Sequence, residues 1–235
     1  MYNTDDMKKI DTEKMMGRYR CVFFDFDGTL VNSGISITDT VRYTLEKRGI
    51  IETDQDKLRL FIGPPLVDSY MGLYGFSKEE ALEAVEDYRD IYRKKNMFNV
   101  DTYEGMRDTL DTLKRKGIVL CIASSKPLPL VEKISEYLDI AQYFEAMFGA
   151  TYDGRLLNKI DVLNEAMKYL ETRYPDMEPK DVLMVGDRMY DAEGAAAVGI
   201  DCAGVSYGFA EDGELEKAGC SYIIDKPGDL VSLVG

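Results

Sequence analysis

The sequence contains no histidine among its 235 residues. Histidine is the base of Ser/His/Asp triads, a frequent metal ligand and the carrier of phosphohistidine chemistry. Its absence excludes a Ser/His/Asp hydrolase, a histidine metal centre and a mechanism that passes through phosphohistidine.

Positive charge is also scarce, with 29 lysines and arginines against 43 aspartates and glutamates and a formal net charge of −14. A chain without a basic face has little to offer a phosphate backbone or an anionic membrane, so we expect no nucleic-acid and no membrane partner. A small phosphorylated substrate remains compatible with this charge, because a metal ion and a few cations can act locally.

Long apolar runs are missing too. No run approaches the roughly 20 residues of a membrane span, and the N-terminus has no apolar signal core. The four cysteines lie far apart, in or beside apolar runs, at Cys21, Cys121, Cys202 and Cys220. This pattern favours buried thiols of a reduced protein over disulfides or a zinc site, and it predicts a cytoplasmic protein.

The length and the order of patterns predict an α/β protein in which a helical insertion interrupts a parallel sheet. Residues 1–18 are a polar tail to which we assign no function. Residues 35–100 carry helical patterns and no obvious strand, including a capping box at Ser77 and Glu80. From Tyr103 onward, apolar strands alternate with helices, which indicates a parallel sheet covered on both faces. The predicted division is a tail at 1–18, a core of 19–34 with 101–235, and an all-helical domain at 35–100.

The strongest motif follows the apolar run Cys21 to Phe24, which is typical of a buried parallel strand. Asp25 and Asp27 come next, separated by one residue and followed by Gly28. At the end of a strand both carboxylates can point into one pocket, and ligands of open α/β sheets bind at that edge. Two close carboxylates repel each other unless a cation neutralises them. The pattern indicates a divalent metal, most naturally Mg²⁺, although Asp-X-Asp-Gly is also common in turns.

Two further candidates for binding an anion follow later in the chain. Ser124 and Ser125 come after a predicted strand at 118–123, just ahead of a predicted helix that begins with a proline. Hydroxyls and free amides there form an anion site, or Ser124 is simply a helix cap. Lys159 precedes an amphipathic helix and is either a surface lysine or a cation that stabilises a transferring phosphoryl group.

A second acidic pair follows the predicted strand at 182–185. Asp187 comes directly after Gly186, and Asp191 lies four residues on, where one helical turn brings it to the same side. Acidic residues at a helix start are also routine, so Asp191 by itself is unremarkable.

Taken in order, these four strand ends resemble the four motifs of the haloacid dehalogenase superfamily, over residues 20 to about 225. The resemblance implies a Rossmann-like core with a helical cap, as in the phosphoglycolate phosphatase-like and 5′-nucleotidase-like branch. It implies that Asp25 is the nucleophile that becomes an aspartyl-phosphate and Asp27 the general acid/base. It implies Mg²⁺ ligands at Asp25, the Asp27 carbonyl, Asp187 and, through a water, Asp191. It implies phosphate-binding groups at Ser124, Ser125 and Lys159.

These patterns predict a Mg²⁺-dependent phosphomonoesterase that acts on a small phosphorylated metabolite. The alternative is a phosphosugar mutase of the β-phosphoglucomutase type, which shares all four motifs and returns the phosphoryl group to a sugar. A dehalogenase would not need Asp27, and a non-enzymatic interaction protein would not need to keep both Asp25 and Asp27. The sequence leaves open which ester is the substrate and whether the protein is a monomer or a homodimer.

Overall fold

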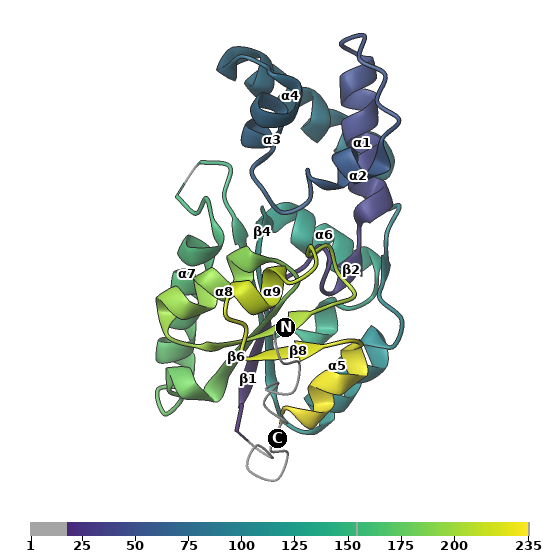
Figure 1. The fold of residues 1–235 in the computed structure, drawn as a ribbon. Coiled ribbons are helices and arrows are strands. Elements are labelled where there is room, and N and C mark those ends of the chain that lie inside the picture. The colour runs from purple at the N-terminus through teal and green to yellow at the C-terminus, as the bar shows by residue number, and fades with distance from the viewer. Residues whose placement is uncertain (1–17, 154, 235) are drawn as a thin grey trace, which may run out of the picture.

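A six-stranded sheet forms the centre of the computed structural model, which describes residues 18–153 and 155–234 (Figure 1). Residues 1–17, nearly all of the predicted tail, lie outside the described residues. All neighbouring strands of this sheet run parallel. The strand order is β5 (Ala146–Ala150), β4 (Val119–Pro127), β1 (Cys21–Phe24), β6 (Val182–Gly186), β7 (Asp201–Val205) and β8 (Tyr222–Ile224). The predicted α/β class is confirmed.

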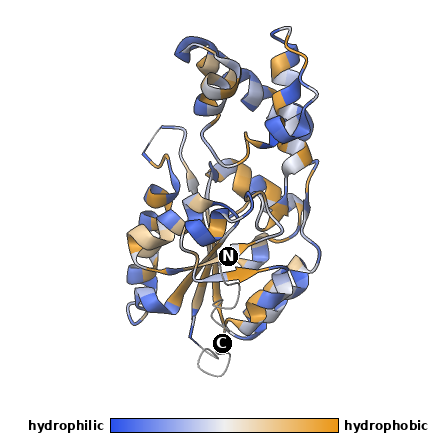
Figure 2. Cartoon of the chain, in the orientation of Figure 1, coloured by the Kyte–Doolittle hydropathy of each residue, from blue (hydrophilic) through white to orange (hydrophobic). Residues whose placement is uncertain are grey.

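Helices cover both faces of the sheet, as the β1 side chains show. Val22 and Phe24 enter a core with α5 (Met106–Arg115) and α6 (Leu128–Tyr137). Cys21 and Phe23 enter a second core with α7 (Lys159–Arg173) and α8 (Met189–Val198). A strand buried on both faces has to be apolar throughout, which explains the continuous apolar runs along the strands (Figure 2). The helices are α5 (Met106–Arg115), α6 (Leu128–Tyr137), α7 (Lys159–Arg173), α8 (Met189–Val198) and α9 (Glu214–Lys217). Short 3₁₀ turns are η3 (Ala141–Tyr143), η4 (Pro179–Asp181) and η5 (Pro227–Ser232).

Residues 34–96, here called the helical segment, form a group of helices beyond the carboxyl edge of the sheet (Figure 1). The short antiparallel pair of β2 (Val31–Asn32) and β3 (Asp101–Thr102) lies where the chain enters and leaves this group. Its elements are α1 (Gly34–Glu46), α2 (Gln55–Arg59), α3 (Leu66–Tyr74), α4 (Lys78–Ile91) and the π-helical turn η2 (Tyr92–Asn96). The predicted capping box of Ser77 and Glu80 starts α4. The division of the chain into core and cap stays a prediction.

One boundary differs from the sequence prediction in a way that matters for the site. β4 continues to Pro127, so Ser124 and Ser125 belong to the strand and α6 begins only at Leu128. The added residues pair with β5 across a register shift. Gly149 permits this close approach, because a Cβ there would lie 2.7 Å from the Lys126 carbonyl oxygen.

Among the described residues, no helix combines the length and the apolar content that a membrane span requires.

Candidate active site

Asp25 and Asp27 leave the end of β1, the strand that lies between β4 and β6. Both line one pocket of about 580 Å³ between the edge of the sheet and the helical segment. The turn needs Gly28, whose φ is +84° and whose amide donates to the Val31 carbonyl at 2.9 Å. A Cβ on Gly28 would lie only 2.1 Å from Oδ2 of Asp187. The turn therefore brings the first motif and Asp187 into direct contact.

Three carboxylates meet beside this pocket. One oxygen each from Asp25, Asp187 and Asp191 lies within 4.8 Å of the others. These three carboxylates are here called the acidic group. Asp187 directly follows β6 and Asp191 lies in the first turn of α8, so the structure brings both next to Asp25. Gly186 makes room, since a Cβ there would lie 2.2 Å from Cγ of Asp191.

The environment opposes ionisation of Asp187 and Asp191. Burial raises the pKa of Asp187 well above its usual value, and the charges of Asp25 and Asp191 raise it further. Burial also raises the pKa of Asp191 to about 6, with Lys159 opposing the rise and Asp25 adding to it. The Thr29 hydroxyl donates to one oxygen of Asp187 at 3.2 Å and the Phe209 amide donates to the other at 2.8 Å. Asp187 is thus held rigidly although its charge is poorly neutralised.

Lys159 is the cation of this group and is only 4 % exposed. Its Nζ lies 2.5 Å from Oδ1 of Asp25 and 2.7 Å from Oδ1 of Asp191, and it donates to the Ala123 carbonyl at 2.9 Å. Burial acts to lower the pKa of Lys159, but the charges of Asp191 and Asp25 raise it above its usual value. Asn158 caps α7, and Lys159 is the first residue of this helix, with its side chain directed inward. The alternative of a surface lysine is therefore wrong.

The carboxylate of Asp27 is not part of this acidic group. Both of its oxygens accept from Nζ of Lys126, at 3.0 and 2.9 Å. The same Nζ donates to the Tyr92 hydroxyl at 2.9 Å. Sequence reasoning gave Lys126 no role, although it follows Ser125 directly at a strand end that already carried a candidate anion site.

The two serines line the same pocket as Lys159. Ser124 is 2 % exposed, and its Oγ accepts from the Lys126 amide at 3.2 Å, so it is not the cap of the following helix. Ser125 is half-buried beside it. The structure thus brings the candidate phosphate-binding side chains to the pocket that contains Asp25.

The opposite wall of the pocket comes from the helical segment. It is largely apolar and aromatic, with Phe61, Ile62, Pro64, Pro65, Leu66, Val85, Tyr88 and Tyr92. Arg188, also without an assigned role in the sequence, joins the two walls: its guanidinium donates to the Ile62 carbonyl and, at 2.9 Å, to Glu214. Gly63, with φ +106°, gives this guanidinium space, because a Cβ there would lie 2.8 Å from it.

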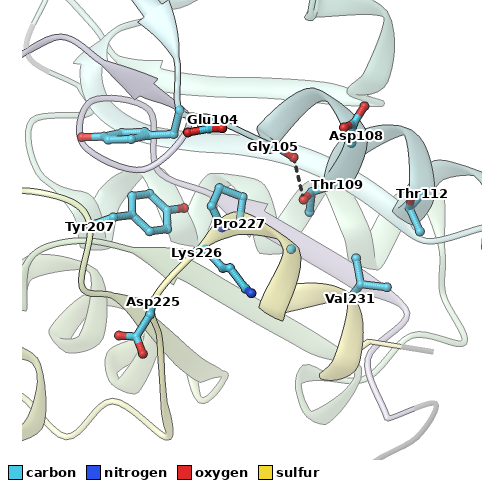
Figure 3. Close-up of a pocket in the computed structure, with 12 residues that line it drawn as sticks. Glu104, Gly105, Asp108, Thr109, Thr112, Tyr207, Asp225, Lys226, Pro227 and Val231 are labelled. Carbon is cyan, nitrogen blue, oxygen red and sulfur yellow. Dashed lines mark hydrogen bonds between the residues drawn. The ribbon is translucent and has the colours of Figure 1, made fainter.

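A second pocket, of about 600 Å³, lies beside α5 and η5 (Figure 3). None of the residues singled out in the sequence lines it. Tyr207 connects it to the first motif, because the Tyr207 hydroxyl donates to the Thr29 carbonyl at 3.2 Å. The candidate residues Asp25, Asp27, Ser124, Ser125, Lys159 and Asp191 line the first pocket instead.

The donor set of the acidic group fits a Mg²⁺ ion. Three buried carboxylates face a single ammonium, which leaves a net negative charge in a region of low dielectric. Carboxylate oxygens are the ligands that Mg²⁺ prefers, and a divalent cation would offset the charge that raises the pKa of Asp187 and Asp191.

Comparison with known proteins places this geometry among phosphate-processing enzymes. The family model of haloacid dehalogenase-like hydrolases matches residues 22–205. A 5′-nucleotidase of Pseudomonas aeruginosa is 34% identical over 84% of this chain and 87% of its own length. Phosphoglycolate phosphatase 1 of the same organism is 28% identical over 90% and 78%. The crystal structure of a predicted phosphatase from Clostridium acetobutylicum superimposes with a TM-score of 0.84 at 39% identity, over 92% of this chain and 97% of that one.

Proposed function

Because the chain belongs to the haloacid dehalogenase-like hydrolase family, we propose that it is a Mg²⁺-dependent phosphomonoesterase that forms an aspartyl-phosphate on Asp25. The observation that carries the proposal is the different surroundings of the two motif carboxylates. Asp25 belongs to the acidic group with Lys159, whereas Asp27 stands apart on Lys126. Two carboxylates in two environments are suited to two roles, a nucleophile and an acid/base.

In the first half-reaction, an oxygen of Asp25 forms a bond to phosphorus while the bond from phosphorus to the ester oxygen breaks. The electron pair stays on the leaving oxygen, which takes a proton from Asp27. Lys159 orients Asp25 through its contact with Oδ1, and Ser124 and Ser125 bind the phosphoryl oxygens.

In the second half-reaction, Asp27 takes a proton from a water molecule as that water attacks phosphorus. The bond from phosphorus to Asp25 breaks, inorganic phosphate leaves and the free carboxylate of Asp25 returns. Asp25, the Asp27 carbonyl, Asp187 and Asp191 would hold Mg²⁺, which when bound offsets the charge of the carboxylates and of the phosphoryl group.

The helical segment acts as the cap of this site, with 35–100 as the cap domain and 19–34 with 101–235 as the core. Its apolar and aromatic wall excludes water from the leaving-group side of the pocket. The relatives favour a small phosphorylated metabolite, either a nucleoside monophosphate or a small acid such as phosphoglycolate. We place the activity in the cytoplasm, in keeping with four free cysteines.

The test is phosphate release from a panel of nucleoside monophosphates, phosphoglycolate, sugar phosphates and pyridoxal phosphate, each with Mg²⁺ and with EDTA. We expect release from at least one ester, lost in EDTA and lost in Asp25→Asn. Release that persists in EDTA contradicts the metal requirement. If no ester is hydrolysed and a sugar monophosphate is isomerised only when a sugar bisphosphate is added, the protein is a mutase.

A further inference from the structure

Lys126 lies between the general acid/base of the proposed reaction and the helical segment. Its ammonium contacts both oxygens of Asp27, at 3.0 and 2.9 Å, and the Tyr92 hydroxyl at 2.9 Å. These three contacts connect the end of β1, the end of β4 and η2 through one atom. One side chain therefore joins the carboxylate of the sheet edge to the wall that covers it.

The surroundings of Lys126 confine its ammonium. The side chain is only 7% exposed, and its Nζ is paired with the Asp27 carboxylate at 2.9 Å. The Nζ also lies 4.8 Å from the centre of the Tyr92 ring, and 5.9 Å from that of Phe26. A buried cation with this many fixed partners has little freedom to turn elsewhere.

Tyr92 in turn is held in place by other residues of the helical segment, to which it belongs. It stacks on Tyr88 of α4, with ring centres 5.7 Å apart and planes 12° apart. Tyr92 begins a π-helical turn whose last residue is Asn96. The backbone carbonyl of Asn96 accepts from the Ser36 hydroxyl, and its side-chain amide donates to the Thr40 hydroxyl, both at 2.8 Å. The position of the Tyr92 hydroxyl thus follows the position of the helical segment.

We propose that Lys126 is a positioning residue that aims the carboxyl group of Asp27, in the protonated form left by the previous turnover, at the oxygen of the leaving group. Tyr92 makes this orientation depend on docking of the helical segment. The inference rests on the proposed function, because it needs Asp27 to protonate the leaving group. When the helical segment is docked, the ammonium has both partners and Asp27 has one defined orientation. When the segment moves away, the ammonium loses the hydroxyl and Asp27 is free to turn. Proton donation is thereby restricted to the closed pocket, from which water is excluded.

The experiment compares two esters of similar size in one assay. 4-Nitrophenolate leaves phosphorus without needing a proton, whereas the alkoxide of 4-nitrobenzyl alcohol is a poor leaving group that needs one. The kinetic constant to compare is kcat/KM, because it covers the steps up to departure of the leaving group and is independent of the later attack by water. Loss of proton donation should therefore lower kcat/KM for 4-nitrobenzyl phosphate and spare 4-nitrophenyl phosphate.

The variants are Lys126→Met, which keeps the length of the side chain, and Tyr92→Phe, which removes only the hydroxyl. We expect Lys126→Met to lower kcat/KM for the benzyl ester at least about tenfold more than for the phenyl ester, since general acids contribute about 10²- to 10⁴-fold. Tyr92→Phe should change the ratio of the two kcat/KM values, benzyl ester to phenyl ester, in the same direction and by a smaller factor. The matched control is Tyr74→Phe, which removes a hydroxyl of the same helical segment that donates to Glu52 at 3.0 Å outside the pocket. It should leave the ratio unchanged.

The outcomes separate the inference from the proposed function. If the wild type hydrolyses both esters and both variants lose activity equally on the two, Lys126 is only structural and the inference is overturned. If Lys126→Met does not fold, Tyr92→Phe decides alone, because it keeps the ion pair with Asp27. A wild type that releases phosphate from neither these esters nor the metabolite panel overturns the proposed function, and the inference falls with it.

Discussion

Removing Mg²⁺ should destabilise this protein near neutral pH and much less in acid, because of Asp191. Burial raises the pKa of this carboxyl from 3.8 to about 6. Between these two values the folded state binds more protons than the unfolded state, so the stability of the metal-free protein falls as pH rises from about 4 to about 6. Above that window the loss stays, and Asp187, whose pKa is raised as well, adds to it in the same direction.

The loss of unfolding free energy can be worked out from the pKa shift of Asp191. About two pKa units correspond to about 3 kcal/mol of unfolding free energy for Asp191 alone. For a chain of this length each kcal/mol moves the melting temperature by roughly 2–4 °C, so Asp191 by itself should lower the melting temperature of the metal-free protein by roughly 6–12 °C between about pH 4 and about pH 7. This contribution is the difference between the wild type and Asp191→Asn. The proposed Mg²⁺ ion would bind the ionised carboxylates of the folded state, so the increase in melting temperature on adding Mg²⁺ should be larger at the higher pH.

The assay is thermal unfolding followed by circular dichroism, in EDTA and in excess Mg²⁺, at both pH values. Asp191→Asn should remove most of the Asp191-dependent fall in melting temperature that is seen in EDTA as pH rises, and it should reduce the increase caused by Mg²⁺. Asp212→Asn, at an exposed position, should leave both quantities unchanged. An Asp191→Asn variant whose metal-free melting temperature changes with pH as that of the wild type does would refute the reasoning.

Four further outcomes can be measured with single substitutions. Asp25→Asn should keep the fold and abolish phosphate release, which circular dichroism and a phosphate assay check together. Asp27→Asn should accumulate an aspartyl-phosphate detectable by intact-protein mass spectrometry, and an unmodified mass during turnover would exclude this role. Lys159→Ala should lower kcat by at least about tenfold and weaken inhibition by inorganic phosphate, because it removes the ammonium beside Asp25. Gly28→Ala should lower the melting temperature and activity, because its Cβ would overlap Oδ2 of Asp187 at 2.1 Å and its φ is +84°; unchanged melting would contradict the clash.

The candidate catalytic motifs could be identified in the sequence because their signals are local. A continuous apolar run such as 21–24 marks a strand buried on both faces, and polar residues directly after it must lie at the edge of the sheet. Asp25, Asp27 and Asp187 all follow such runs. The alternation of strands and helices after Tyr103 then predicts a parallel sheet, whose strands all end at the same edge.

The end of β4 shows where local signals fail. The sequence Ser124 to Pro127 is typical of a helix cap followed by a helix start, and by itself favours that structure. Pairing with β5 along Gly149 extends the strand instead, because hydrogen bonds to a neighbouring strand outweigh a local preference.

The sequence by itself determined the sheet, the helical insertion and the kinds of side chain at each strand end, since these depend on periodicity and turn residues within a few positions. Only the tertiary structure decided which charges face each other. Lys159 contacts Asp25 across 134 positions of the chain and Lys126 contacts Asp27 across 99. No periodicity of the chain encodes such pairs, because each depends on where two separate elements end and how far their side chains reach. Because of this pairing, Asp25 lies in the acidic group with Lys159, whereas Asp27 lies against Lys126 beneath the helical segment.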